Sequence, residues 1–290
     1  PMVKELRERT GAGMMECKRA LVEAGGDLDA AAEALRAAGA AKADKKASRV
    51  AADGRVVIQV SGSKAVIAEV NSETDFVAKD ENFIGFADAV AAASLASGVT
   101  DAVALTGVAL GDATVEVART ELVQKVGENI SVRRAEIIAN DGPIGVYTHG
   151  ARIGAVVALD GGDEILARDI AMHVAATNPT CIDESGVPAE MLETEKRIFT
   201  EQAVESGKPP EIIEKMIGGR INKFLKEITL VGQPFVKDDK QTIGQLLKAA
   251  GASVASFTRY EVGEGIEKKV ENFADEVMKQ IADAKPPKGA

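Results

Sequence analysis

An internal repeat constrains the fold of this chain more than any other feature of its sequence. One alternating apolar pattern opens at Gly54 and turns at Gly62, and a second opens at Gly142 and turns at Gly150 with the same spacing between its glycines. Strict alternation bounded by glycine predicts β-strands joined by tight turns. The sequence therefore predicts two β-hairpins of the same design.

Each hairpin is followed by the same succession of elements. An Ala-rich helical pattern comes first and a further strand pattern later, at residues 86–92 and 130–134 in the first copy and at residues 170–176 and 254–259 in the second. Hairpins combined with helices in this way are typical of α+β folds. We expect a core of two repeated α+β subdomains with antiparallel sheets, at residues 53–140 and 141–262.

The two copies differ where the first hairpin leads into its helix, because the first copy carries extra residues there. These lie in the segment 71–80, which contains Thr74, Asp75, Phe76 and Val77. One interpretation is structural: Asp75 caps the following helix and Phe76 packs into the core. The other is that the segment protrudes and binds a partner protein, since an aromatic residue flanked by charges is common at interfaces.

The second copy has an insertion of its own at about residues 182–230. It contains two helical patterns separated by a breaker at residues 206–210, and apolar residues in the second pattern recur every three or four positions from Ile213 to Ile228. Two long helices joined by a tight breaker predict an antiparallel coiled-coil hairpin. We expect this hairpin to project from the core.

Residues 1–40 predict a compact bundle of three short helices. Breaks at residues 10–13 and 25–27 separate three helical patterns, in which Met14 has the spacing of a core residue and Asp27 suits an N-cap. The bundle resembles a ubiquitin-associated domain. A core this small usually serves to present a surface.

Two segments connect or end these units. Residues 41–52 are polar, Ala-rich and locally basic, which predicts a partly helical linker with a solvated basic face. Residues 263–290 predict a C-terminal helical module, with one amphipathic helix from Val270 to Ile281 and a Pro-rich tail.

Composition and charge exclude several classes of function. The net charge of −10 argues against direct binding of nucleic acid or of anionic lipid. No apolar run approaches the roughly 20 residues of a membrane span, and the N-terminus has no apolar signal core, so we expect a cytoplasmic protein. Cys17 and Cys181 lie far apart and are expected to be reduced thiols.

Residues for bond chemistry do not converge in the sequence. No complete phosphate-binding G-x-x-x-x-G-K-[ST] motif occurs. His149 is expected in an exposed hairpin turn and His173 on a packed or half-exposed helix, without the local spacing of a metal site. We therefore expect neither enzymatic activity nor a metal or cofactor.

Five segments in succession closely resemble one known family, bacterial elongation factor Ts. They are residues 3–18, 74–80, 149–154, 171–176 and 232–236. The resemblance covers essentially the whole chain in order. The resemblance implies a guanine-nucleotide exchange factor for elongation factor Tu, the GTPase that carries aminoacyl-tRNA to the ribosome. It also implies that the complex could form dimers through the core or the coiled coil.

The resemblance also implies which residues contact the partner. In the family, the N-terminal bundle contacts the GTPase domain, which points to Arg7, Met14, Met15 and Lys18; the end of a helix matching Val126 and Gly127 does the same. The loop Thr74–Val77 enters beside the nucleotide site and disturbs its Mg²⁺. The region of His149 faces the third domain of the partner, and the C-terminal helix returns to the GTPase domain.

Our hypothesis is that Phe76 wedges between elements of the partner while Asp75 perturbs the polar network around the metal. An adaptor that binds a partner without affecting nucleotide exchange is the alternative. The composition alone does not exclude it.

Overall fold

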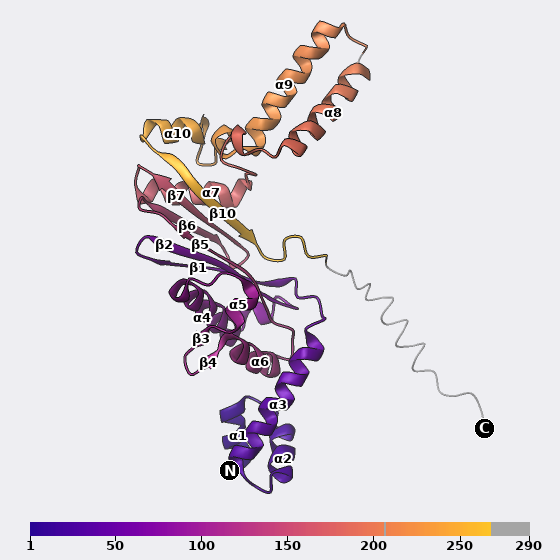
Figure 1. Cartoon of the computed structure of the whole chain (residues 1–290), viewed down its shortest axis with the longest axis vertical. Coiled ribbons are helices and arrows are strands. Elements are labelled where there is room, and N and C mark those ends of the chain that lie inside the picture. Colours follow the sequence, from indigo (N-terminus) through magenta and orange to yellow (C-terminus); the bar gives the residue numbers. More distant parts are fainter. Residues whose placement is uncertain (206, 268–290) are drawn as a thin grey trace, which may run out of the picture.

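Two three-stranded antiparallel sheets form the centre of the computed structural model, which describes residues 1–205 and 207–267 (Figure 1). The first sheet has the order β1-β2-β5 and the second the order β10-β7-β6. The strands are β1 (Asp53–Ser61), β2 (Lys64–Ser72), β5 (Ser131–Ala139), β6 (Ile144–His149), β7 (Ile153–Asp160) and β10 (Ser253–Glu261). In each sheet the second strand of a hairpin is central and pairs with the later strand, which is the topology that the repeat predicted.

The two sheets pack on each other through one face each. Ile67 of the first sheet and Val156 of the second are fully buried in the cluster between them. Gly154 makes this approach possible, since a Cβ at this position would lie 2.6 Å from Cγ1 of Val56. The backbone N–H of Val56 also donates to the carbonyl of Ala151 at 2.8 Å, so the two halves share a hydrogen bond as well as a core.

Helices cover the outer face of each sheet (Figure 1). Phe83 and Val90 of one helix lie in the core of the first half, and Ile170 and Val174 of another lie in the core of the second. The first half contains α4 (Glu81–Ser97), α5 (Ala102–Thr106) and α6 (Val115–Val126), with a small hairpin of β3 (Ala109–Leu110) and β4 (Ala113–Thr114). The second contains α7 (Glu164–Thr177) and α10 (Ile243–Ala249), with a hairpin of β8 (Pro234–Phe235) and β9 (Asp238–Thr242).

The N-terminal bundle consists of α1 (Met2–Thr10), α2 (Met14–Glu23) and α3 (Leu28–Lys46). Its helices break where the sequence predicted, and the Asp27 side chain accepts hydrogen bonds from the backbone of Asp29 and Ala30 as an N-cap. Leu6, Cys17 and Leu35 form its core. Met14 has the helical spacing of these core residues but is 61% exposed, as a partner contact requires.

The third helix is longer than predicted, because α3 continues to Lys46 and Ala43 is buried in the core of the first α+β half. Residues 41–46 of the segment predicted as a partly helical linker are therefore helical. Alanine and lysine are strong helix formers, and the helix gains support by packing on α6. Gly39 lies so near Gln124 that a Cβ would meet its side chain at 2.6 Å. The bundle and the core therefore share one continuous helix.

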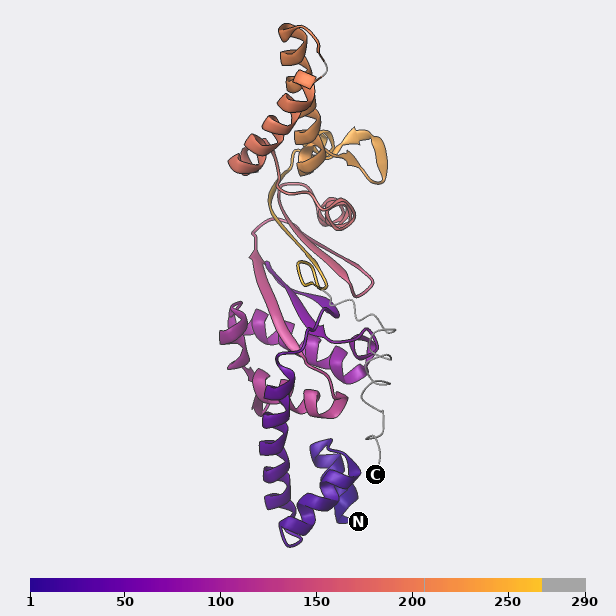
Figure 2. The same ribbon diagram turned by 90° about the vertical axis from the view of Figure 1, so that its right-hand side faces the viewer.

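The insertion forms a helical hairpin of α8 (Ala189–Glu205) and α9 (Pro210–Ile228), which projects at the opposite end of the molecule from the bundle (Figure 2). Phe199 and Phe224 meet edge to face with ring centroids 6.4 Å apart, and Ala203 is buried. An isolated parallel β-bridge pairs the backbones of Cys181 and Thr229 at the base of the hairpin. The coiled-coil character of the hairpin stays a prediction, as does the ubiquitin-associated character of the bundle.

The predicted C-terminal helix, Val270 to Ile281, lies outside the described residues. Within residues 1–205 and 207–267, no helix combines the length and the apolar composition that crossing a membrane would need.

Candidate partner-binding surface

The segment between β2 and α4 protrudes from the first half as a loop of residues 73–80. The equivalent connection in the second half is only residues 161–163, between β7 and α7. The loop contains a single turn of 3₁₀ helix, Val77–Lys79, and ends at Asp80. The Asp80 carboxylate accepts hydrogen bonds from the backbone N–H groups of Asn82 and Phe83, so Asp80 is the N-cap of α4.

Both parts of the structural interpretation of this loop were therefore wrong. Asp75 does not cap α4 but pairs with Lys79, with Oδ2 and Nζ 2.6 Å apart. Phe76 does not enter the core, since it is 81% exposed, whereas Phe83 fills the core at 0% exposure. Ala78, two residues after Phe76, is buried in the core of the first half and anchors the loop there. The fold presents Phe76 to the solvent on an anchored loop.

Glu128 holds the start of this loop. Its carboxylate accepts a hydrogen bond from the backbone N–H of Thr74 at 3.0 Å and another from the Thr74 hydroxyl at 2.7 Å. In return, the Glu73 carboxylate accepts a hydrogen bond from the backbone N–H of Asn129 at 2.6 Å. The loop and the segment that follows α6 are thus joined by reciprocal carboxylate–backbone bonds.

These bonds bring together two of the predicted contact regions, Thr74–Val77 and Val126–Gly127. Gly127 adopts a left-handed conformation with φ 82° and ends α6. Its carbonyl accepts a hydrogen bond from the Lys46 side chain at the end of α3. Burial lowers the pKa of Lys46, and repulsion by the nearby Arg49 lowers it further. The end of α6 is therefore fixed between the long helix and the loop.

The predicted contact residues of the bundle, Arg7, Met14, Met15 and Lys18, are all exposed. Met14 and Met15 begin α2 and are 61% and 73% exposed. The preceding turn lies against the end of α6, because a Cβ at Gly11 would be 3.8 Å from Cδ of Lys125. A continuous series of contacts thus leads from the bundle turn through the end of α6 to the Thr74–Val77 loop.

His149 belongs to a different part of the molecule. It is the last residue of β6 and is exposed, with Nδ1 3.5 Å from the Tyr147 hydroxyl. Its strand lies in the second sheet, whereas the Thr74–Val77 loop follows a strand of the first sheet. If His149 contacts the same partner, it does so through a second surface.

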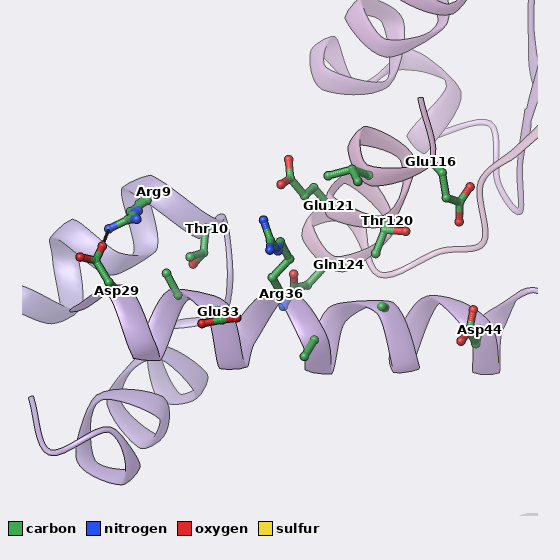
Figure 3. A pocket seen from close by; sticks show the side chains of 14 residues that line it. Arg9, Thr10, Asp29, Glu33, Arg36, Asp44, Glu116, Thr120, Glu121 and Gln124 are labelled. Carbon is green, nitrogen blue, oxygen red and sulfur yellow. Dashed lines mark hydrogen bonds and ion pairs between the residues drawn. The ribbon is translucent and has the colours of Figure 1, made fainter. Parts of the chain in front are cut away.

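A cleft of about 870 Å³ lies between the bundle and α6, with α3 forming one wall and α6 the other (Figure 3). Its rim is charged, and Arg9 pairs with Asp29 there at 2.6 Å. None of the predicted contact residues lines it. Among the described residues, no group of three or more His, Cys, Asp or Glu side chains could hold a metal ion.

His173 has a structural role; the sequence predicted only that it lies on a helix and is packed or half-exposed. It is 0% exposed, and its Nδ1 accepts a hydrogen bond from the backbone N–H of Val236 at 3.3 Å. Nε2 therefore carries the proton and donates to Oε1 of Gln233 at 2.9 Å. Burial lowers the pKa of His173 despite the opposing hydrogen bond to Gln233. This side chain locks α7 to the base of the helical hairpin.

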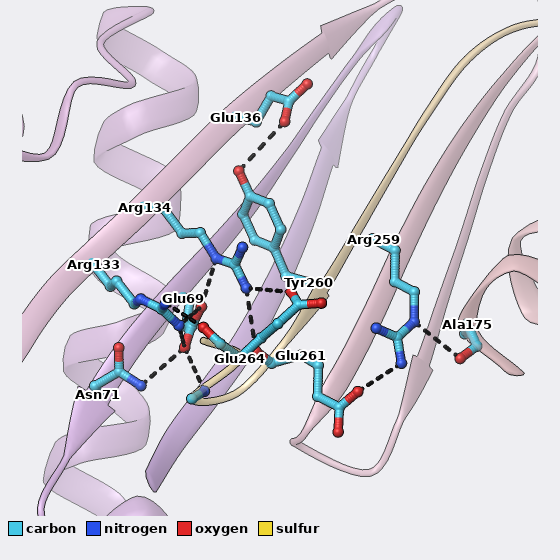
Figure 4. Close-up of polar contacts among 11 residues, drawn as sticks. Glu69, Asn71, Arg133, Arg134, Glu136, Ala175, Arg259, Tyr260, Glu261 and Glu264 are labelled. Atoms are coloured by element: carbon cyan, nitrogen blue, oxygen red, sulfur yellow. Dashed lines mark hydrogen bonds and ion pairs between the residues drawn. The ribbon is translucent and has the colours of Figure 1, made fainter. Parts of the chain in front are cut away.

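A buried carboxylate, Glu69, fixes the segment that leaves β10 (Figure 4). It is 0% exposed and accepts hydrogen bonds from Arg134 Nε at 2.6 Å, from Arg133 at 3.0 Å and from the backbone N–H of Gly263 at 2.8 Å. Burial raises the pKa of Glu69, but these bonds and one from Asn71 together hold it below its usual value. No pattern in the sequence predicted this cluster.

Arg134 also stacks on Tyr260, with its guanidinium carbon 4.0 Å from the ring centroid. Burial, with the nearby Glu136 carboxylate, raises the pKa of Tyr260 to about 12. The cluster thus joins β2 and β5 of one sheet to β10 of the other and sets the direction of the chain towards its C-terminus.

Sequence reasoning missed Glu128, Glu73 and Asn129 as residues of the candidate surface. Their partners lie more than 50 positions away along the chain, and no local pattern marks such a pair. Only the family resemblance placed Val126–Gly127 and Thr74–Val77 on one surface, and it did so without the residues that connect them.

Comparisons with known proteins show one family. A family model described as Elongation factor TS matches residues 73–264, from the start of the loop to the turn after β10. The elongation factor Ts of Thioalkalivibrio sulfidiphilus is 60% identical over 287 residues, which cover 98% of each chain. That of Methylococcus capsulatus is 60% identical over 284 residues and 97% of each chain. That of Legionella pneumophila is 59% identical over 283 residues and 97% of each chain. This chain therefore belongs to the elongation factor Ts family of translation elongation factors, as the resemblance of its five segments predicted.

Proposed function

We propose that this chain is a guanine-nucleotide exchange factor that binds elongation factor Tu in its GDP form and promotes release of GDP. The observation that carries the proposal is Phe76, which is 81% exposed at an anchored loop in a chain with few aromatic residues. The fold keeps this apolar ring in contact with water. Covering the ring with a partner would therefore stabilise the complex. The loop therefore has the properties of a wedge that is formed before the partner arrives.

The proposed mechanism is a linkage between two binding equilibria. A factor that binds the nucleotide-free partner more tightly than the GDP-bound partner must weaken GDP binding by the same ratio. Phe76 enters between elements of the partner, and Asp75 disturbs the polar network that holds Mg²⁺ there. Neither residue needs to touch the nucleotide, and the chain itself carries out no bond chemistry and needs no cofactor.

The ion pair between Asp75 and Lys79 bears on this division of roles. Asp75 is about half exposed, so water screens its attraction to Lys79 and the pair is easily exchanged for another. Breaking the ion pair with Lys79 to direct this carboxylate to the partner therefore costs little. Met14, Met15 and the end of α6 provide the contacts that hold the factor in place while the loop acts.

The test is stopped-flow release of fluorescent GDP from elongation factor Tu. Asp75→Ala and Phe76→Ala should each slow stimulated release at least tenfold, on the order of one lost interface contact. Both variants should unfold at the temperature of the parent, because both side chains are exposed. If both variants stimulate release as the parent does, the wedge mechanism is wrong. If the parent binds elongation factor Tu but does not accelerate release, the chain is an adaptor.

A further inference from the structure

The hydrogen bonds inside the Thr74–Val77 loop converge on one residue, Thr74. Its carbonyl accepts from the Ser72 hydroxyl at 2.8 Å and from the backbone N–H of Ala78 at 3.3 Å. Its hydroxyl oxygen accepts from the backbone N–H of Val77 at 3.4 Å. The position of Thr74 therefore determines the path of the backbone on both sides of Phe76.

Thr74 is in turn positioned from outside the loop by Glu128. The two oxygens of this carboxylate accept one hydrogen bond each, from the N–H and from the hydroxyl of Thr74. Because the hydroxyl donates its proton to Glu128, its lone pair is free to accept the N–H of Val77. Hydrogen bonds to a charged carboxylate are stronger than neutral ones, so this pair is a strong connection between the loop and the body.

The backbone around Glu128 is itself fixed on both sides. Before it, the carbonyl of Gly127 is held by Lys46. After it, Asn129 is 6% exposed and its side-chain amide donates to the carbonyl of Arg49 at 2.8 Å. Glu128 is thus a short rigid arm from the end of α6, and it ends on Thr74.

We propose that Glu128 is a positioning residue for nucleotide exchange: by accepting both hydrogen bonds of Thr74, it holds the loop in the conformation that presents Phe76 to the partner. This inference rests on the proposed function. Glu128 acts through Thr74 and touches neither the nucleotide nor the metal. A loop released from Glu128 keeps Phe76 but spends only part of its time in the competent conformation, which lowers the rate of exchange by that fraction.

The substitution Glu128→Gln tests this with little change of volume. A carboxamide is uncharged and has one acceptor oxygen in place of two, so it cannot accept from both the N–H and the hydroxyl of Thr74 in the present geometry. The matched control is Glu121→Gln, the same chemical change at an exposed position of α6. Both variants should keep the unfolding temperature of the parent within a few degrees.

The first measurement needs no partner. The chain contains no Trp, so Phe76→Trp places a unique fluorophore at the tip of the loop. Adding Glu128→Gln to this variant should increase the nanosecond depolarisation of Trp fluorescence in the free protein. Adding Glu121→Gln should not. If Glu128→Gln leaves the depolarisation unchanged, Glu128 does not hold the loop and the inference is wrong.

The second measurement is stimulated GDP release from elongation factor Tu at increasing factor concentrations, with Phe76 present. Glu128→Gln should lower the saturating rate about tenfold, the loss expected when one charge-assisted hydrogen bond is removed and the other loses its charge. The half-saturating concentration should change less than the rate. A purely structural role would instead reduce the fraction of folded factor and raise that concentration at an unchanged saturating rate, which overturns the proposal.

The two measurements separate the inference from the proposed function. If depolarisation rises but Glu128→Gln exchanges at the parental rate while Phe76→Ala is slow, exchange stands and the positioning role fails. If the parent itself does not accelerate GDP release, the proposed function fails and the positioning role for exchange fails with it. The depolarisation result then still decides whether Glu128 holds the loop.

Discussion

Truncation of Met15 gives a quantitative test of the proposed contact surface on the bundle. Met15 is 73% exposed at the start of α2. Full burial of a Met side chain is worth about 1.5–3 kcal/mol, so covering its exposed part contributes about 1–2 kcal/mol. Met15→Ala should therefore weaken the complex with elongation factor Tu about 5- to 30-fold. Met14→Ala should have a slightly smaller effect, because Met14 is 61% exposed.

The stability of the free protein should hardly change, since a side chain that is already in water loses little when it is shortened. We expect a shift in the free energy of unfolding below about 0.5 kcal/mol. The matched control is Val103→Ala, because Val103 is 79% exposed on α5, outside the proposed surface. Affinity is measured by calorimetric titration of nucleotide-free elongation factor Tu. If Met15→Ala binds as tightly as the parent and Val103→Ala does too, the N-terminus of α2 is not a contact surface.

Two further predictions concern the buried polar residues that support the site. Glu69→Gln should lower the free energy of unfolding by about 3 kcal/mol at pH 7, measured by urea denaturation, because it leaves two arginines without their buried partner. Hydrogen bonds hold the pKa of Glu69 below its usual value, so its contribution is present above about pH 4.3 and is lost as the pH falls below this. The parent should therefore lose more stability than Glu69→Gln on acidification, and parallel pH curves would refute the assignment. Burial lowers the pKa of His173, so its contribution is complete above about pH 6.5 and declines as the pH falls below this value. In thermal unfolding between pH 7 and pH 5, His173→Gln should show a flatter pH dependence than the parent; an equal slope would mean that another group is responsible.

The central architecture could be predicted from the sequence because it rests on local patterns that occur twice. Alternating residues between Gly54 and Gly62, and again between Gly142 and Gly150, define hairpins whatever surrounds them. Asp27 was identified as an N-cap for the same reason, since the residues that it caps follow it directly. Features of this kind need no information from distant parts of the chain.

The errors have physical causes in particular residues. The length of α3 was underestimated because its buried positions near the end are Gly39 and Ala43, which add almost no apolar volume to a polar sequence. Asp75 was weighed as a cap because both it and Asp80 precede the helical pattern of α4. The choice between them depends on the turn Val77–Lys79, which separates Asp75 from the helix.

The candidate surface could be predicted only in part. The unequal repeat favoured exposure of Phe76 but left a buried position open, and the target of Phe76 came from the family resemblance. Glu128 could not be found, since its hydrogen bonds to Thr74 exist only after two distant segments of the chain have packed together. Local sequence can indicate which residue is functional, but the residues that hold it in place are determined by the tertiary structure.

The central claim is that this chain favours the nucleotide-free state of its partner. The most direct measurement is its dissociation constant for elongation factor Tu without nucleotide and with saturating GDP, under the same conditions. We predict much tighter binding without nucleotide, with a ratio equal to the loss of GDP affinity when the factor is bound. Equal affinity for the two states would contradict exchange activity and would leave an adaptor that binds elongation factor Tu without changing it.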